Sequence, residues 1–182
     1  DLAKLLNSEI DLAYQVPLFK LDNKQEFRLN NHLQDKKLIL FHPGYGGSSE
    51  GNLTLDDYLT LSNTVRKLVN TQIIWVFGPD DLNAKEKVEG LIPDSDIIYQ
   101  PTTLLDYCYL IRDSELLIST STGPMHLAGA LNIKTVSFFG DNLFASFERW
   151  ATISDPSQQN NFVINKEKNL QVMKKATVQA LS

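Results

Sequence analysis

The sequence predicts an α/β domain built on a doubly wound parallel sheet. Apolar runs of strand length alternate with segments of helical period from about residue 37 onward. Each run is apolar along its whole length, which is typical of strands that are covered on both faces. Several runs end directly in glycine-rich or hydroxyl-rich turns. In doubly wound sheets such turns lie beside the ligand crevice, at the carboxyl ends of the strands.

Each strand is predicted from an apolar run and each helix from its period or its boundary residues. Thr54 followed by Asp57 has the pattern of a helix start, and Gly90 has that of a helix end. We expect strands over residues 37–42, 72–77, 97–99, 116–120, 135–139 and 162–164. We expect helices over residues 2–6, 54 to about 70, 80–89, 102–112, 124–131, 143–150 and 168–180.

Length and composition indicate one globular domain with an added segment. The 182 residues are 42% hydrophobic and 21% charged, which is enough to bury a core. Residues 37–182 are predicted to form a Rossmann-like domain that binds a nucleotide sugar. Residues 1–36 are predicted to form an N-terminal arm or interdomain connector. The chain starts at Asp1 rather than Met, so we expect it to be part of a longer protein.

The charge balance and the lack of an apolar run long enough to span a membrane lead us to expect a cytoplasmic protein that binds no nucleic acid. The net charge of −5 disfavours a partner with a phosphate backbone. The sequence contains no transmembrane run and no signal peptide. Cys108 is the one cysteine, and its apolar neighbours indicate a buried structural thiol.

The turn from Ser121 to His126 has the features of an anion site. It follows an apolar run, contains Ser121, Thr122 and Gly123, and begins a helix. The first N–H groups of a helix have no acceptor within the helix, and the helix dipole is positive there. His126 could donate a hydrogen bond to a phosphate, and we expect the dipole to lower its pKa. The alternative is an ordinary helix start, capped by Thr122 or Gly123.

A second glycine-rich turn runs from Gly44 to Ser49. Its successive glycines could expose N–H groups to a phosphate, with Gly47, Ser48 and Ser49 as further contacts. The turn lacks the Gly-Lys-Ser/Thr ending of a P-loop and the third glycine of a dinucleotide fingerprint. A simple flexible turn is the alternative.

Acidic residues follow two other strands. Asp80 could bind ribose hydroxyl groups, or Asp80 and Asp81 could simply stabilise a helix start. Asp141, after Gly140, has the same two interpretations. The three histidines lie far apart in the sequence, so we expect no structural metal. Five aromatic residues are expected mostly in the core, with one ring as a candidate border of a base pocket: Phe138, Phe139, Phe144, Phe147 and Trp150.

The residues from Ser119 to Leu131, followed by Lys134 to Gly140, resemble the signature of glycosyltransferase family 9, the lipopolysaccharide heptosyltransferases and their relatives. His42-Pro43-Gly44 with Gly47-Ser48 is similar to the family's other nucleotide-side loop. The resemblance covers residues 37–140 in order. It implies the C-terminal half of a GT-B enzyme that binds a sugar nucleotide of the ADP-heptose type and needs no obligatory metal or other cofactor. Transfer would proceed with inversion.

Residue roles follow from the resemblance. Ser48 and Ser49 would contact phosphate, and Asp80 the ribose. Thr122, Gly123 and His126 would hold the pyrophosphate, and His126 would stabilise the departing nucleotide. A lipid-linked or oligosaccharide acceptor would bind through an N-terminal half, which would place the protein in the cytoplasm, peripheral to the inner membrane.

The chain departs from the family pattern at two positions and leaves other functions open. Glu50 stands near a position where the family often has a lysine, and Ser121 stands where it often has an acidic residue. The family's general base, an aspartate of the N-terminal half, has no counterpart, so we expect these 182 residues to bind a donor without turnover. The alternatives are another GT-B-like enzyme, such as a UDP-sugar epimerase, and a non-catalytic nucleotide-binding or scaffolding module.

Overall fold

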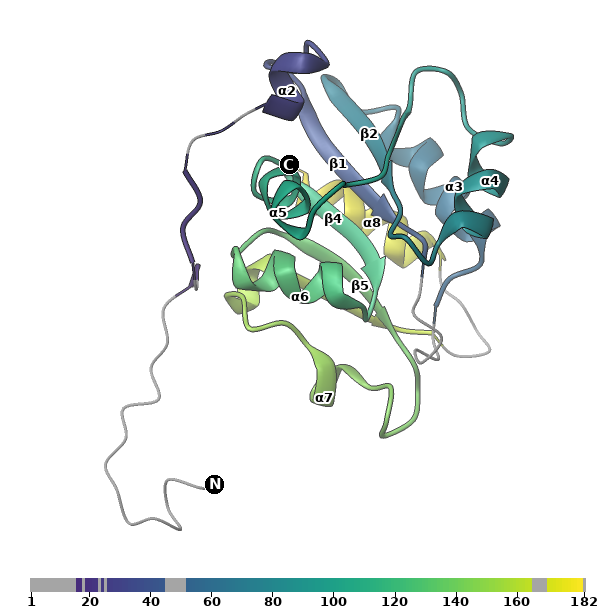
Figure 1. Cartoon of the computed structure of the whole chain (residues 1–182). Coiled ribbons are helices and arrows are strands. Elements are labelled where there is room, and N and C mark those ends of the chain that lie inside the picture. Colours follow the sequence, from purple (N-terminus) through teal and green to yellow (C-terminus); the bar gives the residue numbers. More distant parts are fainter. Residues whose placement is uncertain are drawn as a thin grey trace.

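A computed structural model gives the fold as one six-stranded parallel sheet with helices on both faces (Figure 1). The structure describes residues 16–17, 19–22, 24, 26–44, 52–164 and 170–181. The strand order is β3-β2-β1-β4-β5-β6, and every neighbouring pair is parallel. This order is that of a doubly wound Rossmann-like sheet, which confirms the predicted fold class.

The apolar runs form the strands, and the two at the centre of the sheet, β1 and β4, are buried except for Lys37 at the start of β1. The strands are β1 (Lys37–His42), β2 (Thr71–Val76), β3 (Ile97–Tyr99), β4 (Leu116–Thr120), β5 (Thr135–Phe139) and β6 (Gln159–Val163). The last strand begins three residues earlier than predicted. Its first residues, Gln159 to Asn161, are polar because β6 pairs on one side only, at the edge of the sheet.

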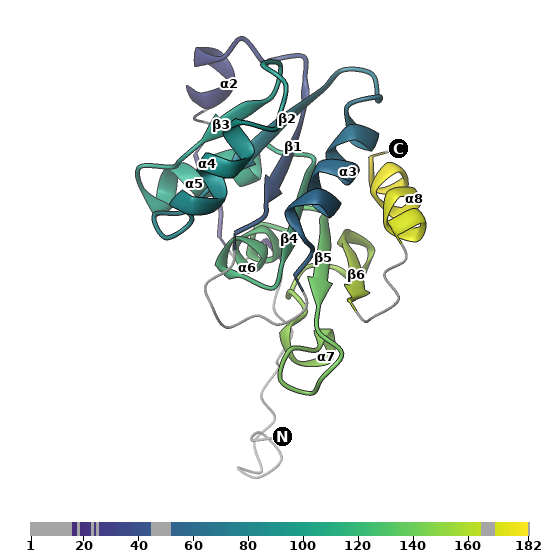
Figure 2. The ribbon, with the colours of Figure 1, turned by 90° about the vertical axis from the view of Figure 1, so that its right-hand side faces the viewer.

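Helices cover both faces of the sheet (Figure 2). An apolar cluster fills the space between sheet and helices on each face. The first lies under α3 (Leu55–Val65), α4 (Leu82–Glu89) and α8 (Leu170–Ala180). The second lies on the other face, under α5 (Leu104–Arg112) and α6 (Gly123–Ala130). Cys108 is buried in this second cluster, as predicted.

Local chemistry explains where the helices begin and end. Thr54 and Asp57 form a reciprocal capping box at the start of α3, as predicted. The helix ends at Val65 rather than near Asn70, because the chain turns back with Asn70 in the left-handed region (φ 59°). The polar helix α4 begins at Leu82, two residues later than predicted. The short helix α7 (Phe147–Trp150) covers only the second half of its predicted range.

Part of the segment before residue 37 packs on the second cluster. Helix α2 (Glu26–Asn30) brings Phe27 against it, and Leu33 is buried there. Arg28 donates hydrogen bonds to the carbonyl oxygens of Leu33 (2.9 Å) and Lys36 (2.7 Å), and also to that of Asp113. The boundary between an N-terminal segment of residues 1–36 and a domain of residues 37–182 stays a prediction. The expected helix over residues 2–6 lies outside the described residues.

The strand order places the ligand crevice. Successive strands are added outward in opposite directions from β1 and β4, which are neighbours in the centre of the sheet. In this class of sheet, ligands bind at that switch point, beyond the carboxyl ends of the strands. His42 pairs with Ser119 across β1 and β4, so Gly44 and Ser121 both follow at the same edge.

Candidate functional site

The turn between β4 and α6 leaves a helix start without a side-chain cap. Thr122 is the N-cap residue, with an extended backbone, yet its side chain makes no capping bond. Its hydroxyl group instead donates to the Thr120 carbonyl oxygen at 3.3 Å. Pro124 has no N–H, and no described residue accepts from the N–H groups of Gly123 and Met125. Two donors at the positive end of the helix dipole are therefore available to an anion.

His126 lies at the fourth position of α6, with an exposed side chain. Its own N–H donates to the Thr122 carbonyl oxygen at 3.3 Å, so its imidazole rather than its backbone is available to a ligand. Partial desolvation holds the pKa of the His126 imidazole below 6.5. The predicted direction is confirmed, although burial, and not the helix dipole, is the cause that the structure gives.

The turns after β1 and β2 meet closely. The Asp81 carboxylate accepts a hydrogen bond from the Gly78 N–H at 2.9 Å. The same carboxylate packs on the backbone of Gly44: a Cβ atom at Gly44 would lie 2.2 Å from Asp81 Oδ1. Gly44 is therefore required by the position of Asp81. Asp80 is exposed, and the atoms nearest to Gly44 all belong to Asp81.

Two buried polar side chains surround this contact. His42 is 4% exposed, and its Nδ1 lies 3.0 Å from the Val76 carbonyl oxygen. A carbonyl oxygen can only accept, so Nδ1 carries the proton. Burial lowers the pKa of His42, and the negative charge of Asp81 opposes this shift. Burial raises the pKa of the Tyr107 hydroxyl, which has no hydrogen-bond partner among the described residues.

A short network of hydrogen bonds links the loop after β1 to the end of β4. The Tyr58 hydroxyl donates to Asn52 Oδ1 at 2.8 Å, and Asn52 Nδ2 donates to the Pro43 carbonyl oxygen at 3.2 Å. Burial raises the pKa of Tyr58, and a hydrogen bond with the Thr120 backbone acts against that rise. The ends of the loop that follows β1 are thus tied to the residue before the anion-binding turn.

The structure brings together only some of the residues that the sequence indicates. Gly44, Ser121, Thr122, Gly123 and His126 lie at the switch point, on neighbouring strand ends. Asp80 and Asp141 are exposed and flank it, beyond β2 and β5. Gly47, Ser48, Ser49 and Glu50 lie outside the described residues. Their roles, like those of the other site residues, stay predictions.

Sequence reasoning missed His42, Asp81 and Tyr107 as a group. The signal that could have found them is positional, because His42 and Asp81 both follow strands that are adjacent in the sheet. Tyr107 gave no such signal. It looked like one more apolar position of a helix, and only the fold buries it near Asp81; burial raises its pKa, and the charge of Asp81 adds to that rise.

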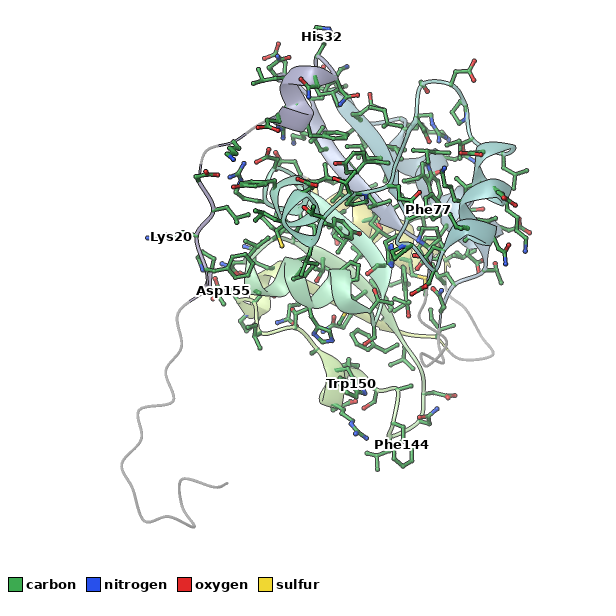
Figure 3. The ribbon with its side chains drawn as sticks, in the orientation of Figure 1. Lys20, His32, Phe77, Phe144, Trp150 and Asp155 are labelled. Atoms are coloured by element: carbon green, nitrogen blue, oxygen red, sulfur yellow. The ribbon has the colours of Figure 1, made fainter. Side chains whose placement is uncertain are left out.

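The aromatic residues after β5 divide between the core and the surface. Phe138 and Phe139 are fully buried, as predicted. Phe144 is 75% exposed and Trp150 is 41% exposed, so the prediction of a core position is wrong for these two. They lie on the segment that projects past the carboxyl ends of the strands (Figure 3), too far from the sheet to be covered by it.

Neither a metal centre nor a membrane span is found in the part of the chain that the structure describes. No group of three or more His, Cys, Asp or Glu side chains there could hold a metal ion. No helix of that part is both long and apolar enough to cross a bilayer. Metal independence stays a prediction.

The fold and the uncapped helix start at the switch point define a Rossmann-like domain with a candidate anion site. The model of glycosyltransferase family 9 (heptosyltransferase) matches residues 1–179, and the chain belongs to this family. It is similar to lipopolysaccharide heptosyltransferase 1 of Campylobacter coli, with 29% identity over 176 residues, which are 92% of this chain and 47% of that protein.

Solved structures share the fold at low sequence identity. The E. coli ADP-heptose lipopolysaccharide heptosyltransferase II matches with a TM-score of 0.66 and 17% identity, over 90% of this chain and 51% of that one. The E. coli heptosyltransferase WaaC with ADP matches with a TM-score of 0.65 and 13% identity, over 93% and 52%. The chain therefore spans about half the length of these relatives.

Proposed function

We propose that the chain is the donor-binding half of an inverting glycosyltransferase that uses a sugar nucleotide, with ADP-heptose as the type of donor. The observation that carries this proposal is the uncapped start of α6 beside Gly44, at the switch point. The N–H groups of Gly123 and Met125 would hold a phosphate, and His126 would donate to the diphosphate that leaves. Both similar solved structures are named with ADP or ADP-heptose, which supports an adenine nucleotide.

The whole reaction needs a second surface. The chain covers about half of its relatives, so we place the acceptor and the general base on another half of the protein. The acceptor would be a lipid-linked or oligosaccharide glycan of the lipopolysaccharide type, glycosylated at the inner face of the cytoplasmic membrane. The 182 residues alone would bind the donor without transferring its sugar.

Calorimetric titration of the 182-residue chain with ADP, UDP and CDP tests the donor. We expect ADP to bind at least about tenfold more tightly than UDP or CDP, a difference of about 1.4 kcal/mol. A preference for UDP would point to an enzyme of the UDP-sugar epimerase kind. Binding of none of the three would contradict a nucleotide site and leave a non-catalytic scaffolding role.

An assay of sugar transfer tests the division into halves. The isolated chain, incubated with ADP-heptose and a lipopolysaccharide acceptor, should form no product. Measurable transfer by the 182 residues would contradict the assignment of the base to another half.

A further inference from the structure

A row of side chains leads outward from the anion-binding turn. The His126 ring meets the Trp150 ring edge to face, with the centroids 6.4 Å apart. The Arg149 guanidinium stacks over the Trp150 ring at 5.0 Å and lies 5.6 Å from the Phe144 ring centroid. Trp150 and Phe144 mark the segment that projects beyond the sheet (Figure 3). We call residues 141–150 the arm.

Hydrogen bonds within the arm hold its shape. Asn142 Oδ1 accepts from the N–H groups of Phe144 (2.9 Å) and Ala145 (3.0 Å). The Gly140 N–H donates to the Ala145 carbonyl oxygen at 3.0 Å, and Trp150 Nε1 donates to the Phe144 carbonyl oxygen at 2.7 Å. The Trp150 indole is therefore tied to the backbone of Phe144 before any ligand binds, which reduces the entropy cost of binding.

The charge of Arg149 is not balanced within the described part of the chain. Arg66 and Arg112 there form ion pairs with Asp96 and Asp113, and Arg28 donates to carbonyl oxygens. Arg149 is exposed, and no described carboxylate lies within ion-pair distance of it. A guanidinium stacked on aromatic rings with free N–H donors is suited to bind phosphate or carboxylate by two parallel hydrogen bonds.

We propose that Arg149, stacked on Phe144 and Trp150, binds one anionic group, a phosphate or a carboxylate, of the sugar acceptor, and that the rest of the acceptor is bound by the other half of the protein. The proposal rests on the proposed function, in which the diphosphate of the donor occupies the turn at His126. The row of contacts puts Trp150 between His126 and Arg149, so one oxyanion does not engage both. A second anion would bind at Arg149, on the far side of Trp150 from His126. There the exposed indole offers an apolar face to a sugar ring.

The chain carries its own reporter for this site. It has two tryptophans, of which Trp75 is fully buried and Trp150 is exposed in the arm. Quenching of tryptophan fluorescence by a ligand at Arg149 therefore reports on Trp150. The probes are glucose 6-phosphate, glucuronate and glucose, titrated into the full 182-residue chain. We expect saturable quenching by one or both of the anionic sugars, which identifies phosphate or carboxylate as the preferred group, and none by glucose.

Substitutions assign the effect to Arg149. The Arg149→Gln variant should weaken binding of the anionic sugar about tenfold or more, and Arg149→Lys by less, because lysine keeps the charge without the planar fork. Lys175→Gln removes the same charge from α8, which packs on the other side of the sheet from α6, and should change nothing. ADP affinity should stay within about twofold in all three variants.

Other results would overturn the proposal. An unchanged affinity for the anionic sugars in Arg149→Gln would do so. Equal weakening of ADP would assign Arg149 to the donor diphosphate instead. Self-association in sedimentation velocity that Arg149→Gln abolishes would make the arm a protein interface. If the natural chain binds the anionic sugar but does not bind ADP, that result would contradict the proposed function and not the anion site on the arm.

Discussion

The Asp81 carboxylate lies so close to the backbone of Gly44 that a Cβ atom there would come within 2.2 Å of Oδ1. The contact joins the turns after β1 and β2 at the edge where the candidate site lies. The hydrogen bond that the Asp81 carboxylate accepts from the Gly78 N–H keeps this carboxylate in place. Residue 44 must therefore lack a side chain.

The Gly44→Ala substitution should lower the free energy of unfolding by about 1–3 kcal/mol, because the added methyl group displaces Asp81. In the double variant Gly44→Ala/Asp81→Ala the cost should be less than the sum of the two single costs. Asp80→Ala, which removes the neighbouring exposed carboxylate, is the matched control and should be additive. Urea unfolding measures the free energy of unfolding of each variant. If Gly44→Ala lowers it as much in the Asp81→Ala background as in the natural chain, the contact between the two residues is contradicted.

Gly123 should behave in the opposite way. A Cβ atom at Gly123 would meet no atom within 4 Å, so Gly123→Ala should leave stability unchanged or raise it by about 0.4–1 kcal/mol. The methyl group would stand where a phosphate approaches the helix start, and ADP affinity should fall about tenfold. Thermal unfolding and calorimetry on the same sample separate the two effects. Unchanged ADP affinity would show that no phosphate approaches Gly123.

His42 should make stability depend on pH. Its pKa in the folded chain lies below the unfolded value of 6.5, so the unfolded chain binds more protons in this range. The free energy of unfolding should therefore fall as the pH drops below about 6.5, by at most about 1.4 kcal/mol per pH unit for this group.

The His42→Asn variant tests this dependence, because the asparagine amide can still donate to the Val76 carbonyl oxygen but does not titrate. Urea unfolding between about pH 7 and pH 5 should show a smaller fall in the variant than in the natural chain. Carboxylates that do not interact with His42 contribute equally to both proteins, so they cancel in the comparison, and the difference reports on His42 together with its neighbour Asp81. Identical slopes would mean that His42 does not resist protonation in the folded state.

His126 should make ADP binding depend on pH. Its pKa in the free chain is below 6.5, and a bound diphosphate would raise it by stabilising the imidazolium. ADP affinity should therefore increase as the pH falls toward the pKa of the free chain and level off below it. The phosphate of ADP also titrates near pH 6. The His126→Gln variant reports that background, and a profile equal to that of the natural chain would exclude His126 from the phosphate contact.

The sequence predicted the elements of the sheet well, because a strand buried on both faces is an unbroken apolar run. Leu116 to Thr120 is such a strand. The edge strand β6 was placed late, because its polar first residues carry no apolar signal. The helix after Thr54 was extended too far, since Leu68 continues the apolar period while Asn70 reverses the chain.

The candidate site was predicted in position but not in detail. Parallel strands end at one edge, which is why Gly44 and the turn from Ser121 to His126 could be placed together. The sequence alone cannot distinguish the roles of the two adjacent aspartates. In the structure, the turn places the Asp81 carboxylate against Gly44 and leaves Asp80 exposed. The arm was mistaken for core because exposed aromatic residues look the same in a sequence as buried ones.

Calorimetric titration of ADP into the natural chain and into His126→Ala asks whether the start of α6 binds the diphosphate of a nucleotide. His32→Asn is the matched control: His32 lies on the opposite side of the molecule (Figure 3), and asparagine tolerates its left-handed backbone, φ 55°. We expect ADP to bind the natural chain and His32→Asn equally, and His126→Ala at least about tenfold more weakly. Equal binding of ADP by all three proteins would contradict a diphosphate site at the start of α6.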